Sequence, residues 1–249
     1  MKADDIRTVA IVGAGVMGPG MAMTFAQAAY TTILRDVSEE QLEKSRNTIS
    51  TGRFGWENAI ARGKLTRAQV TEFATHISYT THIEDLAGAD LVIEAVPEDE
   101  DIKKTVLSEL DRVVKPEAIF ATNTSGYAIA TLNHVIERRD RFIGMHWFSP
   151  ANIMRIIELI YAPETSEETL TTMEDVCARI GKTSVRVKDA PGSYGFIANR
   201  VYFAAVAEAR KIVESGIASA EDVDTAMKLG YNWPAGPLEM AQGKQSGWE

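Results

Sequence analysis

Three glycines at fixed spacing could bind the phosphates of a nucleotide. Gly13, Gly15 and Gly18 follow a short apolar run and precede a pattern typical of a helix. The first permits a tight turn, the second lets a pyrophosphate approach the backbone, and the third lets the helix pack closely on the strand. The phosphates would face the N–H groups at the helix N-terminus, with Val16 and Met17 in the same turn.

An acidic residue after the next predicted strand indicates which dinucleotide would bind. Asp36 follows the strand-like run 31–34 and lies eighteen residues after Gly18. A carboxylate there can accept hydrogen bonds from the adenosine ribose and repels the 2′-phosphate of NADP. Alternation along the strand directs Arg35 to the other face, so Arg35 is not expected to bind that phosphate. The pattern predicts NAD, and an ordinary structural turn is the alternative.

A histidine and a glutamate could supply acid–base chemistry. His146, alone among four histidines, falls at the C-terminal end of a predicted strand. It could take an alcohol proton while hydride leaves for a cofactor, or it could simply pack between its aromatic neighbours. Glu158 is the one acid inside an apolar strand, where it either faces solvent on an edge or is buried with a partner. A carboxylate partner would fix the tautomer of the imidazole and stabilise its cation.

Alternating strands and helices would bring these residues to one edge of a sheet. The later strand-like runs are 76–79, 90–94, 118–122, 142–146, 154–160 and 183–187. This alternation predicts an α/β fold with a doubly wound parallel sheet that helices cover on both faces. Ligands bind such sheets beyond the C-terminal ends of the strands. The polar residues expected to line that crevice are Glu98, Asn123, Ser125, His146 and Ser149.

Seven ordered segments resemble the L-3-hydroxyacyl-CoA dehydrogenase family. They are GAGVMG, VIEAVPED, NTS, GMHWFSP, IIELI, GFIANR and SAEDVDTAMKLGYNWPAGPLE, and they extend over nearly the whole chain. The resemblance implies a Rossmann-type NAD-binding sheet and the oxidation of (S)-3-hydroxyacyl-CoA thioesters to 3-ketoacyl-CoA. It also implies that His146 is the general acid/base and Glu158 its orienting partner.

Further site residues follow from the same resemblance. Ser125 would hydrogen-bond the substrate oxygen near the nicotinamide, and Asn199 would help to hold the substrate and the histidine. Glu98 and Lys103 would be additional NAD contacts. Without the resemblance, Ser125 could be a helix cap, Asn199 an exposed helix residue and Lys103 part of a solvated helix face.

The chain departs from the family pattern at four points. Gly126 replaces the second of two serines, and Ser149 replaces an asparagine that commonly contacts the acyl-CoA. Residues 193–195 are an insertion, and the chain ends soon after Glu239, where the family continues for several helical turns. These differences bear on the acyl and CoA contacts rather than on NAD binding or the His–Glu pair.

The pattern becomes purely helical after a turn-rich stretch at residues 189–193. We therefore expect a Rossmann-like NAD-binding domain at 1–189 and a small, shortened helical domain at 190–249, for dimerisation and substrate binding. A segment of that size buries little surface, and its long helix at 196–214 has more apolar surface than one neighbour covers. These features, with the resemblance, predict a homodimer joined through the C-terminal helices.

Composition limits the partners. The 249 residues include 26 Lys+Arg and 35 Asp+Glu, and the formal charge of −9 argues against nucleic acid or an anionic membrane. No apolar run reaches about 18 residues, so no transmembrane helix is expected, and the first residues do not resemble a targeting peptide. Cys177 is expected in the core of a cytoplasmic protein, and no metal site is expected.

Two other functions stay open. One is a related NAD dehydrogenase that acts on a free hydroxy acid without CoA. The other is a non-catalytic NAD-binding relative, against which the presence of Ser125, His146, Glu158 and Asn199 argues.

Overall fold

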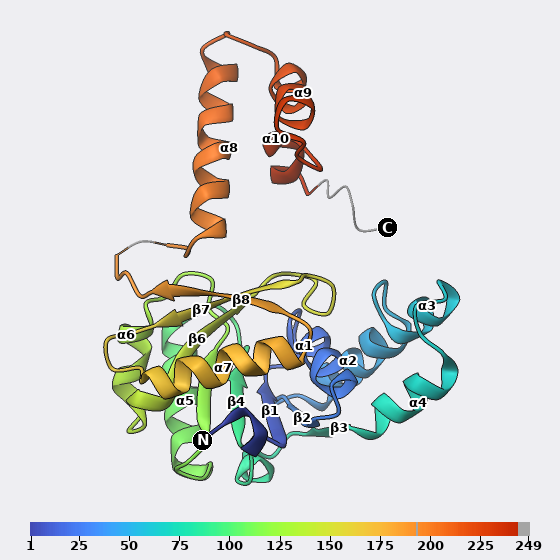
Figure 1. Ribbon diagram of the computed structural model, residues 1–249, viewed down its shortest axis with the longest axis vertical. Coiled ribbons are helices and arrows are strands. Elements are labelled where there is room, and N and C mark those ends of the chain that lie inside the picture. Colours follow the sequence, from blue (N-terminus) through green and yellow to red (C-terminus); the bar gives the residue numbers. More distant parts are fainter. Residues whose placement is uncertain (193, 244–249) are drawn as a thin grey trace. The chain divides into compact units, whose positions relative to one another are not determined.

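A mostly parallel β-sheet forms the centre of the first of two compact units, Met1–Ser193 and Tyr194–Glu249 (Figure 1). The computed structural model describes residues 1–192 and 194–243, and over these the sheet has eight strands in the order β3-β2-β1-β4-β5-β6-β7-β8. The chain moves outward from β1 to β3 and returns to β4 on the other side of β1. Dinucleotides bind doubly wound sheets at such a reversal. The strands are β1 (Thr8–Val12), β2 (Thr31–Arg35), β3 (Ile77–Thr80), β4 (Leu91–Glu94), β5 (Ile119–Thr122), β6 (Phe142–Trp147), β7 (Ile156–Tyr161) and β8 (Thr183–Lys188).

This sheet confirms the predicted α/β fold, but one pair of strands departs from the parallel arrangement. β6 and β7 run antiparallel, whereas the other neighbouring pairs of described strands are parallel. The connection between β6 and β7, residues 148–155, is too short for a parallel crossover, which needs a dozen or more residues. The reversal places β7 between β6 and β8, in the interior of the sheet.

Helices cover both faces of the sheet. The chain moves in opposite directions from β1 to β2 and from β4 to β5, so right-handed crossovers place α1 and α5 on opposite faces. In Figure 1, α7 crosses in front of the strands on the same side as α1 and α2. The helices of this unit are α1 (Gly18–Gln27), α2 (Glu39–Thr51), α3 (Trp56–Ala61), α4 (Arg67–Thr75), α5 (Glu100–Val113), α6 (Ile129–Leu132) and α7 (Glu167–Arg179), with 3₁₀ turns η1 (Ala3–Asp5), η2 (Ile83–Leu86), η3 (Asn133–Val135) and η4 (Arg139–Arg141).

The second unit has three helices over its described residues, α8 (Ala198–Glu214), α9 (Ala220–Tyr231) and α10 (Pro237–Ala241). The buried carboxylate of Asp224 accepts the N–H groups of Leu238 at 2.9 Å and Glu239 at 3.0 Å, so α9 caps α10. Gly236 makes this approach possible, because a Cβ atom there would lie 2.2 Å from Asp224 Oδ1. None of the described helices in either unit is both long enough and apolar enough to span a membrane.

The units divide after Ser193, four residues beyond the boundary that the sequence predicts at 189. Asp189 belongs to the sheet unit in both divisions, and its N–H donates to the carbonyl of Tyr161 at 2.9 Å. Its carboxylate also accepts the N–H of Ala130 at 2.8 Å. The expected insertion at 193–195 includes Ser193, which lies outside the described residues.

A buried lysine fixes the connection that reverses the chain after β6. Lys182 is 8% exposed, and its ammonium donates to the carbonyl oxygens of Ala151 at 2.8 Å and Met154 at 2.5 Å. It also lies 5.5 Å from the centre of the Trp147 ring. Burial lowers the pKa of Lys182 from 10.5 to about 8.

This pKa predicts how stability depends on pH. Between about pH 8 and 10, the native state has lost the Lys182 proton and the unfolded state still holds it. The free energy of unfolding of the parent, relative to Lys182→Met, should therefore rise with pH, by up to about 1.4 kcal/mol per pH unit. Urea unfolding at pH 7.5 and 9.5 measures the difference. For the control Lys64→Met, at an exposed lysine, the difference in free energy of unfolding from the parent should not change with pH. If the difference between the parent and Lys182→Met stays constant or falls as pH rises, the prediction is wrong.

Candidate active site

The glycine turn leaves open space beside the start of α1. A Cβ atom at Gly13, where φ is 113°, would lie 2.4 Å from the carbonyl oxygen of Ala95. A Cβ atom at Gly18 would lie 2.1 Å from the carbonyl oxygen of Gly13. At Gly15, no atom lies within 4 Å of such a Cβ. Met17, the N-cap of α1, makes no side-chain capping bond, so backbone N–H groups can face an anion. The turn therefore fits the pyrophosphate of a dinucleotide.

Asp36 is oriented toward this turn from the end of β2. Its carboxylate accepts the N–H of Ala14 at 2.9 Å and that of Ser38 at 3.1 Å. Each oxygen keeps a further lone pair for a hydroxyl donor. Val16 is 86% exposed on the same turn, whereas Arg35 is buried. The geometry thus fits a ribose at Asp36.

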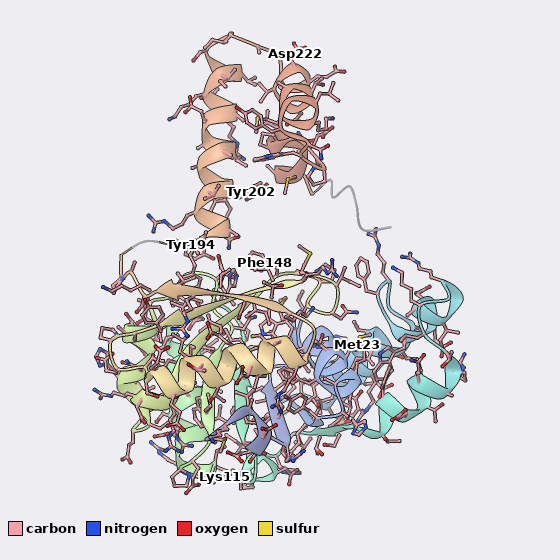
Figure 2. The ribbon with its side chains drawn as sticks, in the orientation of Figure 1. Met23, Lys115, Phe148, Tyr194, Tyr202 and Asp222 are labelled. Atoms are coloured by element: carbon pink, nitrogen blue, oxygen red, sulfur yellow. The ribbon has the colours of Figure 1, made fainter. Side chains whose placement is uncertain are left out.

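His146 and Glu158 lie directly opposite each other on β6 and β7. The imidazole Nδ1 is 2.7 Å from Glu158 Oε2, and the residues are 3% and 1% exposed. Of the two environments open to Glu158, the structure has the buried carboxylate with a partner. Phe148, labelled in Figure 2, packs near the imidazole with its ring centre 4.6 Å away. A buried carboxylate on Nδ1 fixes the tautomer that carries its hydrogen there.

The loop after β5 is tied both to β6 and to the loop after β4. Asn123 Oδ1 accepts the N–H of Trp147 at 2.9 Å, next to His146 in the chain. Glu98 accepts the Ser125 N–H at 2.8 Å and the Thr124 hydroxyl at 2.7 Å. The structure therefore brings Ser125, Glu98 and the strand end of His146 into one hydrogen-bonded edge.

Lys103 is fully buried, which excludes the solvated helix face that its sequence alone allowed. Its ammonium lies 2.9 Å from Glu94 Oε1 and 3.3 Å from Glu98 Oε2. Glu94, at the end of β4, is also fully buried and is not among the residues expected in the site. The signal was present, because Glu94 directly follows three apolar residues, 91–93, as Glu158 follows two.

The remaining two expected residues lie in the connection after β6 and in the second unit. Ser149 is exposed in the connection after β6, which Asn152 also holds by donating to the carbonyl of Phe54 at 2.8 Å. Asn199 lies in the first turn of α8, in the second unit. Among the described residues, no group of three or more acids, histidines or cysteines is arranged to hold a metal ion.

Family models match both units. Residues 8–190 match the 3-hydroxyacyl-CoA dehydrogenase NAD binding domain, and residues 195–243 match the C-terminal domain of the same enzyme. The chain belongs to the 3-hydroxyacyl-CoA dehydrogenase family. Its first unit is accordingly the NAD-binding domain, which agrees with the open glycine turn and the oriented Asp36.

Similar proteins include several members of this dehydrogenase family. A 3-hydroxybutyryl-CoA dehydrogenase of Clostridioides difficile is 37% identical over 93% of this chain and 80% of its own length. The mitochondrial hydroxyacyl-coenzyme A dehydrogenase of Rattus norvegicus is 36% identical over 94% of this chain and 75% of its own. The crystal structure of (S)-3-hydroxybutyryl-CoA dehydrogenase PaaH1 from Ralstonia eutropha has a TM-score of 0.91 and 38% identity, covering 96% of this chain and 82% of that one.

Among the similar structures is one named for a substrate other than a hydroxyacyl-CoA. It is a 5-formyl-3-hydroxy-2-methylpyridine 4-carboxylic acid 5-dehydrogenase, described as an NAD⁺-dependent dismutase. It is 36% identical, with a TM-score of 0.79, and the match covers 91% of this chain and 71% of that one.

The glycine geometry predicts different effects for two similar substitutions in this dehydrogenase. Gly15→Ala places a methyl group in open space, so the fold should be unchanged while NAD affinity falls at least about tenfold. Gly13→Ala should lower the free energy of unfolding by about 2 kcal/mol or more, because it combines a clash with an unfavourable φ. Urea unfolding and calorimetric NAD titration measure the two effects. Undiminished NAD affinity of Gly15→Ala would refute this assignment of the turn.

Proposed function

We propose that this protein is an NAD-dependent dehydrogenase that oxidises (S)-3-hydroxyacyl-CoA to 3-ketoacyl-CoA. The buried His146–Glu158 pair at the C-terminal end of β6 carries the proposal, because it supplies a base beside a dinucleotide site. The names of the relatives support the thioester substrate.

His146 moves the proton in the proposed reaction. NAD, which the glycine turn and Asp36 would hold, would supply the acceptor for the hydride from carbon 3 of the substrate. His146 Nε2 takes the hydroxyl proton, while Glu158 holds Nδ1–H and stabilises the imidazolium. In the reverse direction the imidazolium returns this proton to the keto oxygen. The Ser125 hydroxyl hydrogen-bonds the same substrate oxygen, and Glu98 fixes Ser125 through its N–H.

The other expected residues have proposed binding roles. Asp36 binds the adenosine ribose, Glu98 contacts the nicotinamide half, and Lys103 acts on NAD indirectly, through Glu98. Ser149 and Asn199 contact the substrate. The pyrophosphate site and its neighbours comprise Gly13, Gly15, Val16, Met17, Gly18 and Asn123.

A homodimer in the cytoplasm completes the proposal. On α8, Val201 is 64% exposed and Phe203 is 48% exposed, so apolar surface is left for a second copy. Burial raises the pKa of Cys177 to about 12, which suits an inert core thiol in a reducing compartment. Light scattering at micromolar concentration tests the assembly. An active monomer would contradict the proposed dimer and leave the proposed activity unaffected.

A second candidate substrate is a free carboxylic acid. One similar dehydrogenase is named for a pyridine carboxylic acid, and this name is the observation that favours a free acid as the substrate. NADH oxidation should be faster with acetoacetyl-CoA than with acetoacetate, the corresponding free acid. Faster reduction of acetoacetate than of any CoA ester would favour the second candidate.

Removing the proposed base should affect turnover and spare cofactor binding. His146→Gln should lower kcat by roughly 10²–10⁴, the usual worth of a positioned acid/base. Glu158→Gln should cause a similar loss without unfolding, and NAD affinity should stay within about twofold in both. Steady-state kinetics and calorimetry measure these effects, with exposed His134→Gln as the matched control. Parental turnover by His146→Gln would remove His146 from the mechanism.

A further inference from the structure

A buried ionic cluster lies beneath the loop that carries Ser125. We define the Glu94 cluster as Glu94, Glu98 and Lys103, with the hydroxyls of Thr122 and Thr124 that bind it. Glu94 accepts the Lys103 ammonium at 2.9 Å, the Val96 N–H at 2.8 Å and the Thr122 hydroxyl at 2.5 Å. Glu98 accepts the Thr124 hydroxyl and the Ser125 N–H.

This cluster has an unbalanced charge. Two carboxylates share one ammonium, which gives a formal net charge of −1. Glu94 and Lys103 have no exposed side-chain surface, and Glu98 is 32% exposed. Solvent and salt screen the fully buried charges of Glu94 and Lys103 much less than surface charges, whereas Glu98 is partly exposed. The net negative charge of the cluster therefore acts on the adjoining C-terminal edge of the sheet.

The nicotinamide is expected at the edge of the sheet that adjoins the cluster. β4 and β5 end on the side of the switch point opposite the glycine turn and Asp36. Asn123 links the same loop to Trp147, the residue after His146. A cofactor that binds pyrophosphate at Gly15 must therefore place its reactive ring on this side to meet His146.

We propose that the Glu94 cluster biases cofactor binding toward the oxidised form. The nicotinamide ring is positively charged in NAD⁺ and neutral in NADH, so a buried negative charge beside it stabilises bound NAD⁺ selectively. Contacts at the adenosine half are the same for both forms and cancel in the ratio of affinities. Glu94 is a positioning residue, because its charge acts on the nicotinamide through Lys103 and Glu98. The inference rests on the proposed function, which places the nicotinamide beside His146.

Glu94→Gln tests this bias, because it removes one negative charge and keeps the side-chain shape. Calorimetric titration should give a ratio of Kd for NADH to Kd for NAD⁺ that falls by roughly tenfold. NAD⁺ affinity should fall while NADH affinity is unchanged or rises, and the shift should persist in 0.5 M salt, roughly the regime in which surface charges are screened. Equal weakening of both forms, or a ratio within about twofold of the parent, would overturn the inference.

Two further variants separate charge from structure. Thr122→Val removes a hydrogen bond to Glu94 without changing charge, so the ratio should stay near the parental value. A ratio shift in Thr122→Val equal to that in Glu94→Gln would overturn the proposal. If Glu94→Gln does not fold, Glu98→Gln removes a partly exposed charge and should shift the ratio in the same direction. Failure of the parent to bind NAD⁺ would instead refute the proposed function itself.

Discussion

The contact between His146 and Glu158 depends on one reversal of strand direction. Because β7 runs antiparallel to β6, the two side chains share a row of the sheet and meet at 2.7 Å. A shift of one residue in this register would turn Glu158 to the opposite face. Each side chain also makes the burial of the other tolerable, since an unpaired buried carboxylate is strongly destabilising. Lys182 stabilises the connection that produces the reversal.

The same edge of the sheet joins the His146–Glu158 pair to the glycine turn. Gly13 contacts the loop after β4 so closely that a side chain would not fit. From that loop, hydrogen bonds lead through Glu98 to Ser125, and Asn123 connects the next loop to β6. These candidate site residues are thus held at strand ends, which are rigid, and in the short segments that follow them, rather than in long loops.

The sequence predicts most of this architecture and part of the site. The glycine spacing, Asp36 and the alternation of elements lead to the NAD-binding fold, since each depends on local pattern. The antiparallel β7 could not be predicted from alternation, because the direction of a strand depends on the length and path of its connection. The Glu94 cluster and the burial of Lys103 depend on contacts between separate elements, and a lysine on an amphipathic helix resembles a solvated one.

The most direct test of the account follows the hydride itself. (S)-3-Hydroxybutyryl-CoA with deuterium at carbon 3 is incubated with the protein and NAD⁺, and the NADH formed is analysed by mass spectrometry. The account predicts that deuterium appears in NADH from the (S) thioester and not from the (R) thioester, and that its formation slows greatly in His146→Gln. Absence of transfer from the (S) thioester, or equal transfer from both, would contradict it.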